Sequence, residues 1–112
     1  MAIQNWSDSI VVVELQDDPA FTDDVTALSD LVDNRKDVDV LMNFGAVSFL
    51  NSSNIAKLLR LRKQVVVSNH RRLLLCGINT HVWGVFLVTG LDKLFEFADD
   101  ISSGLATVQM AQ

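Results

Sequence analysis

The sequence predicts an α/β fold in which a mixed, mostly parallel β-sheet is covered by four helices. Short apolar runs rich in valine, isoleucine and leucine alternate with segments whose apolar residues recur at helical spacing. Two such runs precede the first helical segment, which indicates that a hairpin opens the sheet. The predicted order of elements is therefore β-β-α-β-α-β-α-β-α, with the hairpin strand antiparallel and the other strands mainly parallel.

The first half of the chain supplies three of the strands and one helix. The strands are expected at residues 2–6, 10–15 and 38–42, where β-branched and other apolar residues dominate. The helix is expected between the last two of these strands. Thr22 is its predicted N-cap, and carboxylates follow in the first turn, where they meet the positive end of the helix dipole.

A second helix is expected from residue 55 onward. The apolar side chains that share its inner face are Ile55, Leu58, Leu59, Val65 and Val66. Arg62 projects onto the middle of this face. We expect its stem to lie across the edge of the core while its charged head stays in water.

Two strands and two helices complete the predicted fold. The strands are expected at residues 71–76 and 94–97. The helix between them has Thr80 as its predicted N-cap and ends at Gly90, and the last helix begins at Asp99-Asp100. The side chains expected in the core are Val11, Val13, Val40, Met42, Leu74 and Cys76.

Composition bounds the class of protein. The 112 residues are 49% hydrophobic and 21% charged, which suits one folded domain over residues 1–112 and excludes a disordered chain. Residues 51–76 carry six basic side chains and no acidic one, but the net charge of the chain is −5. Because the acidic remainder opposes phosphate binding, we interpret the basic block as a solvated helix face and expect no nucleic-acid partner.

Few residues could carry catalysis or bind a metal. Cys76 is the only cysteine, so the chain has neither a disulfide framework nor a cysteine-rich zinc site. His70 and His81 are the only histidines, and neither falls into a recognisable arrangement with a serine. A Gly-x-Ser-x-Gly motif, a glycine-rich phosphate loop and a dinucleotide fingerprint are also absent. We therefore expect no enzyme, no metal and no cofactor.

The chain is expected to be soluble, intracellular and cytoplasmic, with no membrane contact. Its first residues lack the basic flank and apolar run of a signal peptide. The apolar region 73–91 approaches transmembrane length, but Asn79-Thr80-His81 interrupts its centre. A buried strand, a turn and a helix explain this region better.

One short polar motif could carry function. Asn51-Ser52-Ser53-Asn54 lies at a predicted junction between a strand and a helix. Asparagine and serine are common N-cap residues, so the motif is explained by helix capping alone. The same free N–H groups at a helix start would also accommodate a phosphate on one of the serines. Both interpretations stay open at this point.

Two stretches resemble the STAS domain family. Residues 40–55, VLMNFGAVSFLNSSNI, are similar to its central signature, in which a strand, an apolar connector and Asp-Ser-Ser-Gly or Asp-Thr-Ser-Gly open the second helix. Residues 85–95, VFLVTGLDKLF, are similar to the family's Leu-x-x-Thr-Gly-Leu-x-x-Leu-Phe ending. In size the chain resembles the single-domain anti-sigma factor antagonists of bacteria.

That resemblance implies regulation of transcription by partner switching. An unmodified antagonist binds an anti-sigma factor, typically a serine kinase, and phosphorylation ends the binding. The serine at the position that the family phosphorylates is Ser53, and Ser52 is the rival site. The expected partner-binding residues are Asn51, Ser52, Ser53, Asn54, Lys57, Asp17 and Asp18.

Two other functions are weighed against this one. Asn43 and Asn51 stand where the family usually has aspartate, and Asn54 stands in place of the motif's glycine. These substitutions would suit a scaffold that binds its partner constitutively and no longer switches. A small-ligand or nucleotide-binding module ranks last because no phosphate loop is present. A weak homodimer is left open, as are the identities of the partner, the sigma factor and the upstream signal.

Overall fold

The computed structural model describes residues 2–110 and has one five-stranded sheet with strands in the order β1-β2-β3-β4-β5. The strands are β1 (Ile3–Asn5), β2 (Ile10–Gln16), β3 (Asp39–Ala46), β4 (Leu73–Cys76) and β5 (Glu96–Ala98). The helices are α1 (Ala20–Asn34), α2 (Ser52–Arg62), α3 (Thr80–Thr89) and α4 (Ile101–Met110), with a π-helical turn η1 (Lys63–Ser68) and a 3-10 turn η2 (Leu91–Lys93). Only β1 is antiparallel to its neighbour. The predicted fold class and element order are confirmed.

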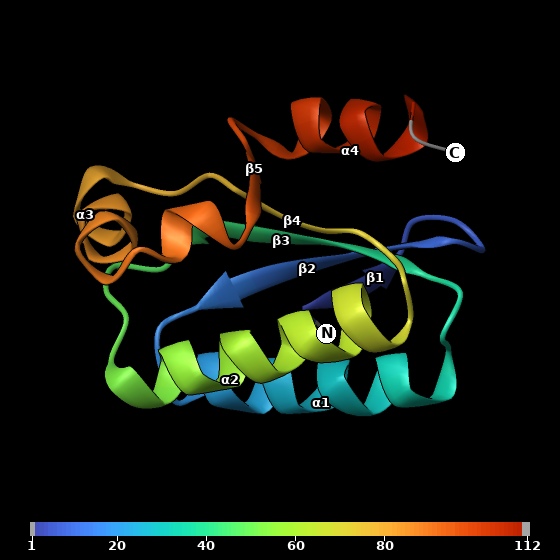
Figure 1. Cartoon of the computed structure of the whole chain (residues 1–112), viewed down its shortest axis with the longest axis horizontal. Coiled ribbons are helices and arrows are strands. Elements are labelled where there is room, and N and C mark those ends of the chain that lie inside the picture. Colours follow the sequence, from blue (N-terminus) through green and yellow to red (C-terminus); the bar gives the residue numbers. More distant parts are fainter. Residues whose placement is uncertain (1, 111–112) are drawn as a thin grey trace.

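Helices cover both faces of the sheet. Figure 1 shows α1 and α2 side by side on one face, α4 on the opposite face and α3 at one end. Alternate residues of each strand serve the two faces, so Val11 packs towards α1 while Val12 packs in the cluster under α4. Strands buried on both faces need apolar residues at every position, which explains why their sequences are continuous apolar runs. The six predicted core side chains, Val11, Val13, Val40, Met42, Leu74 and Cys76, are all fully buried.

The start of α1 differs from the prediction. The helix begins at Ala20 after Pro19, and no side chain caps it at that position. Thr22 lies inside the first turn, where its backbone N–H and its hydroxyl both donate to Asp18 Oδ1, at 3.0 and 2.7 Å. Thr22 is therefore a donor to an upstream carboxylate and is not the N-cap.

The start of α3 also differs by one residue. Asn79 is the N-cap, because its side chain accepts a hydrogen bond from Val82 N at 2.8 Å. Thr80 is the first helical residue. The predicted end at Gly90 is confirmed: its φ of 75° is left-handed, a conformation that glycine adopts without strain.

Several strand boundaries differ from the prediction, and the largest shifts are in β3, β4 and β5. β3 runs on to Ala46, beyond the expected end at residue 42, and β4 begins at Leu73 because Arg71 N bonds to Val65 O. The last strand is Glu96–Ala98, not residues 94–97. Leu94 N bonds to Leu91 O, so the 3-10 turn holds the chain out of the sheet for two more residues.

The inner face of α2 was predicted with one wrong residue. Leu61 is buried, whereas Leu59 is 37% exposed. Leu58, Leu61 and Val65 are separated by three and four residues, the ordinary α-helical spacing, so they share the inner face although Val65 lies in the π-helical turn that follows α2. Arg62 is half-buried, and its Nε donates to Leu94 O at 2.7 Å. Its head group is therefore hydrogen-bonded to the backbone just after η2, whereas the prediction placed it in water.

Candidate functional site

The polar motif predicted from the sequence lies at a corner of the molecule where β3 passes into α2. The connecting residues 47–51 are held by two hydrogen bonds and by two buried side chains. Ser48 N donates to Asp17 Oδ1 at 2.8 Å, and Asn79 Nδ2 donates to Val47 O at 2.8 Å. Val47 and Leu50 are buried, which anchors the connector from below. The start of α2 is therefore a fixed surface.

A capping box closes the first turn of α2. Asn51 is the N-cap: its Oδ1 accepts from Asn54 N at 2.8 Å, and Asn51 N donates to Asn54 Oδ1 at 3.1 Å. The usual box pairs serine or threonine with glutamate or glutamine, and here two asparagines perform both roles. Asn54 is only 2% exposed. Asn54 therefore stabilises the start of α2 from the interior, and almost none of its surface is accessible to a partner.

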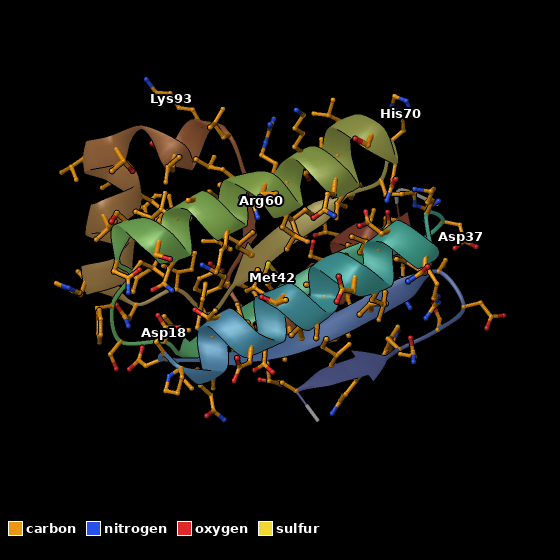
Figure 2. The ribbon with its side chains drawn as sticks, turned by 90° about the horizontal axis from the view of Figure 1, so that it is seen from below. Asp18, Asp37, Met42, Arg60, His70 and Lys93 are labelled. Carbon is orange, nitrogen blue, oxygen red and sulfur yellow. The ribbon has the colours of Figure 1, made fainter. Side chains whose placement is uncertain are left out.

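Asp18 joins this corner to the start of α1. Its Oδ2 accepts from Asn54 Nδ2 at 2.9 Å and from Asn51 Nδ2 at 3.3 Å. Its Oδ1 accepts from Thr22. Hydrogen bonds from the Thr22 and Asn54 side chains lower the pKa of Asp18 from 3.8 to about 2, because they stabilise the carboxylate. Figure 2 shows Asp18 at the end of the molecule where α1 and α2 both begin.

The two serines differ in their contacts. Both are exposed in the first turn of α2. Ser53 Oγ accepts a hydrogen bond from Lys57 Nζ at 2.9 Å, one helical turn away. Among residues 2–110, the Ser52 side chain has no hydrogen bond. The corner thus presents one free hydroxyl and one that is held by an ammonium group.

The structure brings most of the predicted partner-binding residues together. Asp18 bonds to Asn51 and Asn54, and Lys57 bonds to Ser53, while Asp17 holds the connector through Ser48. The backbone hydrogen bond from Ser48 is also the main reason that the pKa of Asp17 is lowered. Both aspartates are engaged within the chain, so their first role is to order the corner.

Sequence reasoning missed two of the residues that build this corner. Ser48 supplies the backbone donor to Asp17, and Thr22 supplies two donors to Asp18. The four-residue spacing between Asp18 and Thr22 was a local signal that could have been used. Ser48 had no such signal, since its partner lies 31 residues away in the sequence.

The family is decided by comparison with known proteins. The family model that describes the STAS domain matches residues 7–104. This chain belongs to the STAS domain family. Among curated protein sequences, none matches it significantly.

Solved structures share this STAS fold at low sequence identity. A STAS domain protein from Planctomyces limnophilus, described as an anti-sigma-factor antagonist, superposes with a TM-score of 0.81 at 17% identity, covering 96% of this chain and 97% of that one. RsbS of Moorella thermoacetica, in a serine-to-glutamate variant, gives 0.81 at 16% identity over 97% and 94% of the two chains. The phosphorylated form of SpoIIAA, a Bacillus cell fate determinant, gives 0.71 at 20% identity over 95% and 96%. The fold of anti-sigma factor antagonists is therefore the fold of this STAS domain.

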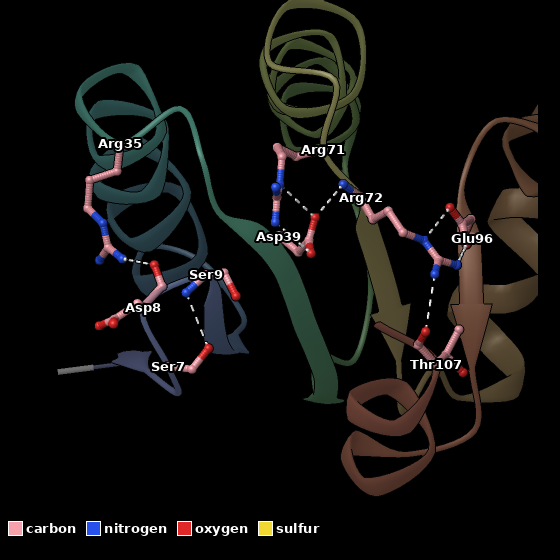
Figure 3. Close-up of polar contacts among 9 residues, drawn as sticks. All are labelled: Ser7, Asp8, Ser9, Arg35, Asp39, Arg71, Arg72, Glu96 and Thr107. Atoms are coloured by element: carbon pink, nitrogen blue, oxygen red, sulfur yellow. Dashed lines mark hydrogen bonds and ion pairs between the residues drawn. The ribbon is translucent and has the colours of Figure 1, made fainter. Parts of the chain in front are cut away.

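A second polar cluster of the STAS domain lies at the other end of β3. Asp39, the first residue of β3, is 3% exposed and accepts from the Arg71 guanidinium at 3.0 Å through both oxygens and from Arg72 N at 2.9 Å. Arg72 forms an ion pair with Glu96 and donates to Thr107 O at 3.2 Å. Figure 3 shows these contacts joining β3, β4, β5 and α4. Since every charge in it is matched, the cluster is structural.

The rest of the described chain offers little chemistry. Residues 2–110 contain no group of three His, Cys, Asp or Glu side chains that could hold a metal ion. Burial raises the pKa of the Cys76 thiol to about 11, which disfavours the reactive thiolate. His81 is exposed. None of the helices in this range is both long enough and apolar enough to span a bilayer.

Proposed function

We propose that this STAS domain is an anti-sigma factor antagonist that works by partner switching. In this proposal the unmodified domain binds an anti-sigma factor with serine-kinase activity, and phosphorylation of Ser53 ends the binding. The observation that carries it is the exposed serine pair on a fixed corner of a fold that anti-sigma factor antagonists share. The domain acts by binding and does not itself catalyse a reaction.

The corner suits a docking surface because its shape is set before a partner arrives. The connector donates hydrogen bonds to Asp17 and Asp18 and accepts one from Asn79, so binding would not have to order a loop. Phe49, which is 50% exposed in the connector that leads to the serines, adds apolar area. In the proposed interface the contacts come from the exposed or half-exposed members of the predicted set, and Asn54 contributes from inside by capping α2.

Phosphorylation would change the charge of this surface without unfolding it. The kinase transfers the γ-phosphoryl group of ATP to Ser53 Oγ: an O–P bond forms, the β–γ bond breaks with ADP leaving, and the hydroxyl proton passes to the kinase. The phosphate adds about −1.5 to −2 charges at pH 7. In the first turn of α2 it meets backbone N–H groups and the positive end of the helix dipole. A partner docked there would face a desolvated, repelling charge.

Substitution of Ser53 tests the switch. We expect Ser53→Ala to bind the partner constitutively and Ser53→Glu to lose roughly 2–4 kcal/mol, about 30- to 1,000-fold in affinity. The partner is first isolated by pull-down from the native cell, and affinity is then measured by titration calorimetry. Ser102→Glu is the matched control, because Ser102 is also exposed in the first turn of a helix but lies on α4. Both Ser53 variants are expected to melt near the parent.

A phosphorylation assay completes this test. The protein is incubated with the isolated kinase and ATP, and the modified residue is mapped by mass spectrometry, with Ser52 as the rival site. Absence of phosphate on both serines, together with unchanged affinity of Ser53→Glu, contradicts partner switching. That result would favour a constitutive scaffold, which one observation supports: the Asn51–Asn54 capping box already orders the start of α2 in its unmodified form.

A further inference from the structure

Ser53 and Lys57 form a pair on one face of α2. They are four residues apart, which places their side chains one turn from each other, and Lys57 Nζ donates to Ser53 Oγ at 2.9 Å. The residue four positions after Ser52 is Ala56, which has no donor. Of the two candidate serines, only Ser53 therefore has a cationic side chain within hydrogen-bond distance, and neither helix capping nor exposure explains this difference.

We propose that Lys57 is the phosphate-pairing residue of the switch, which binds a phosphate on Ser53 and not one on Ser52. This inference rests on the proposed function for the presence of the phosphate, but the pairing itself needs only the geometry of α2. The ammonium group already contacts the oxygen that would carry the phosphorus. A phosphoserine oxygen extends further from the backbone than the hydroxyl does, so Lys57 can reach it by a change of rotamer.

The charges around Lys57 leave it available for this role. Lys57 is half-buried at a groove between α1 and α2 with a volume of about 210 Å³, whose lining residues are Val25, Thr26, Ser29, Asp30, Lys57 and Arg60. Asp30 is the only acid in this lining, and Lys57 makes no ion pair with it. Asp18, the acid nearest to the capping motif, is engaged by Thr22, Asn51 and Asn54. Arg60 adds a second cation one turn beyond Lys57.

The pairing changes what a partner would meet at the corner. In the unmodified domain the Lys57 ammonium is partly exposed and can contact an acidic group on the partner. In the phosphorylated domain the same ammonium is drawn to the phosphate. Modification would thus add negative charge and withdraw a positive contact at once, and charge pairs of this kind control both specificity and association rate.

The test measures the second pKa of the phosphate itself. Phosphoserine is incorporated at Ser53 during translation or by ligation, so that no kinase is needed, and ³¹P NMR follows its titration near pH 6. Because an i,i+4 pair stabilises the dianion, we expect the titration midpoint in Lys57→Gln to lie about 0.3 pH units or more above that in the parent. Lys57→Arg is expected to restore the lower value, and Arg60→Gln, which removes the same charge one turn away, to change it less than half as much.

The same titration with phosphoserine at position 52 completes the comparison. There we expect Lys57→Gln and Arg60→Gln to have equal, small effects. Equal effects of the two variants with phosphoserine at position 53 would overturn the inference, because the phosphate would then sense only the general field of α2. If Lys57→Gln shifts the midpoint but the kinase leaves Ser53 unmodified, the pairing stands and the proposed switch fails. If the kinase modifies Ser53 but the midpoints of the parent and Lys57→Gln do not differ, the switch stands and the pairing fails.

Discussion

At the scale of single residues, Asp18 couples the starts of two helices. One of its oxygens accepts from Thr22 at the start of α1, and the other accepts from Asn54 inside the first turn of α2. All of these partners are donors, so the contacts are strongest with the ionised carboxylate. Protonation of this one side chain therefore weakens the contact between the starts of α1 and α2.

The pH dependence of stability follows from the pKa of Asp18. It is lowered from 3.8 to about 2 by folding, so the stabilisation is fully present above the unfolded value and is lost as the pH falls from about 4 to about 2. In Asp18→Asn one carboxylate oxygen is replaced by an NH₂ group, which cannot accept a hydrogen bond. This group would face either the donors of Asn51 and Asn54 or those of Thr22. We expect this variant to be less stable than the parent at pH 7 and to lose less stability between pH 4 and pH 2, measured by urea denaturation.

Asp37→Asn is the matched control for Asp18→Asn. Asp37 is exposed and has no side-chain hydrogen bond within residues 2–110. Its variant is expected to lose stability in parallel with the parent over the same pH range. If the curve for Asp18→Asn is also parallel to that of the parent, the hydrogen bonds of Asp18 are not what acid removes.

At the scale of elements, the glycines of α3 and α4 have opposite surroundings. A Cβ atom added at Gly84 in α3 would meet nothing within 4 Å. One added at Gly104 in α4 would lie 2.7 Å from Leu41 Cδ1, and Leu41 is fully buried in β3. The absence of a side chain at Gly104 is what lets α4 pack closely on its face of the sheet, whereas Gly84 has no packing role.

Two substitutions at these glycines should shift stability in opposite directions. We expect Gly84→Ala to stabilise the domain by about 0.5–1 kcal/mol, because alanine restricts the unfolded chain and favours the helix. We expect Gly104→Val to destabilise it by about 1–3 kcal/mol through overpacking against Leu41. Chemical denaturation measures both, and a stabilising Gly104→Val would show that α4 does not pack closely against β3.

At the scale of the whole molecule, the Asp39–Arg71 ion pair joins segments 32 residues apart. Asp39 begins β3, and Arg71 lies just before β4, so the pair aligns the starts of two parallel strands. The Asp39 side chain is 5% exposed and that of Arg71 is 27% exposed. A buried carboxylate that loses its partner is costly, whereas an exposed pair such as Arg72–Glu96 contributes little.

Removing Arg71 should therefore cost more than disrupting the exposed pair. We expect Arg71→Met to destabilise the domain by about 3 kcal/mol, at the low end for a broken buried pair because Arg72 N still donates to Asp39. Glu96→Gln is expected to cost less than about 1 kcal/mol. In the double variant Asp39→Asn with Arg71→Met the buried charge is gone, so part of the loss should be recovered. Equal costs for Arg71→Met and Glu96→Gln would contradict the burial of this pair.

Features that depend on neighbouring residues could be predicted from the sequence. Continuous apolar runs indicated strands buried on both faces, and the motif around Asn51 indicated the start of α2. Gly90 was expected to end a helix, and it does so in a left-handed conformation that glycine adopts without strain. These signals are local, so composition and spacing were enough to place the elements, the fold class and the exposed serines.

Features that depend on distant residues are visible only in the folded chain. The contacts of Asp18 with Asn51 and Asn54 join residues that lie 33 and 36 positions apart in the sequence. The strand pairs that bring these segments together form only when parallel strands align across intervening helices. No local pattern encodes that alignment, and it is the reason that the contacts of the corner had to be read from the folded chain.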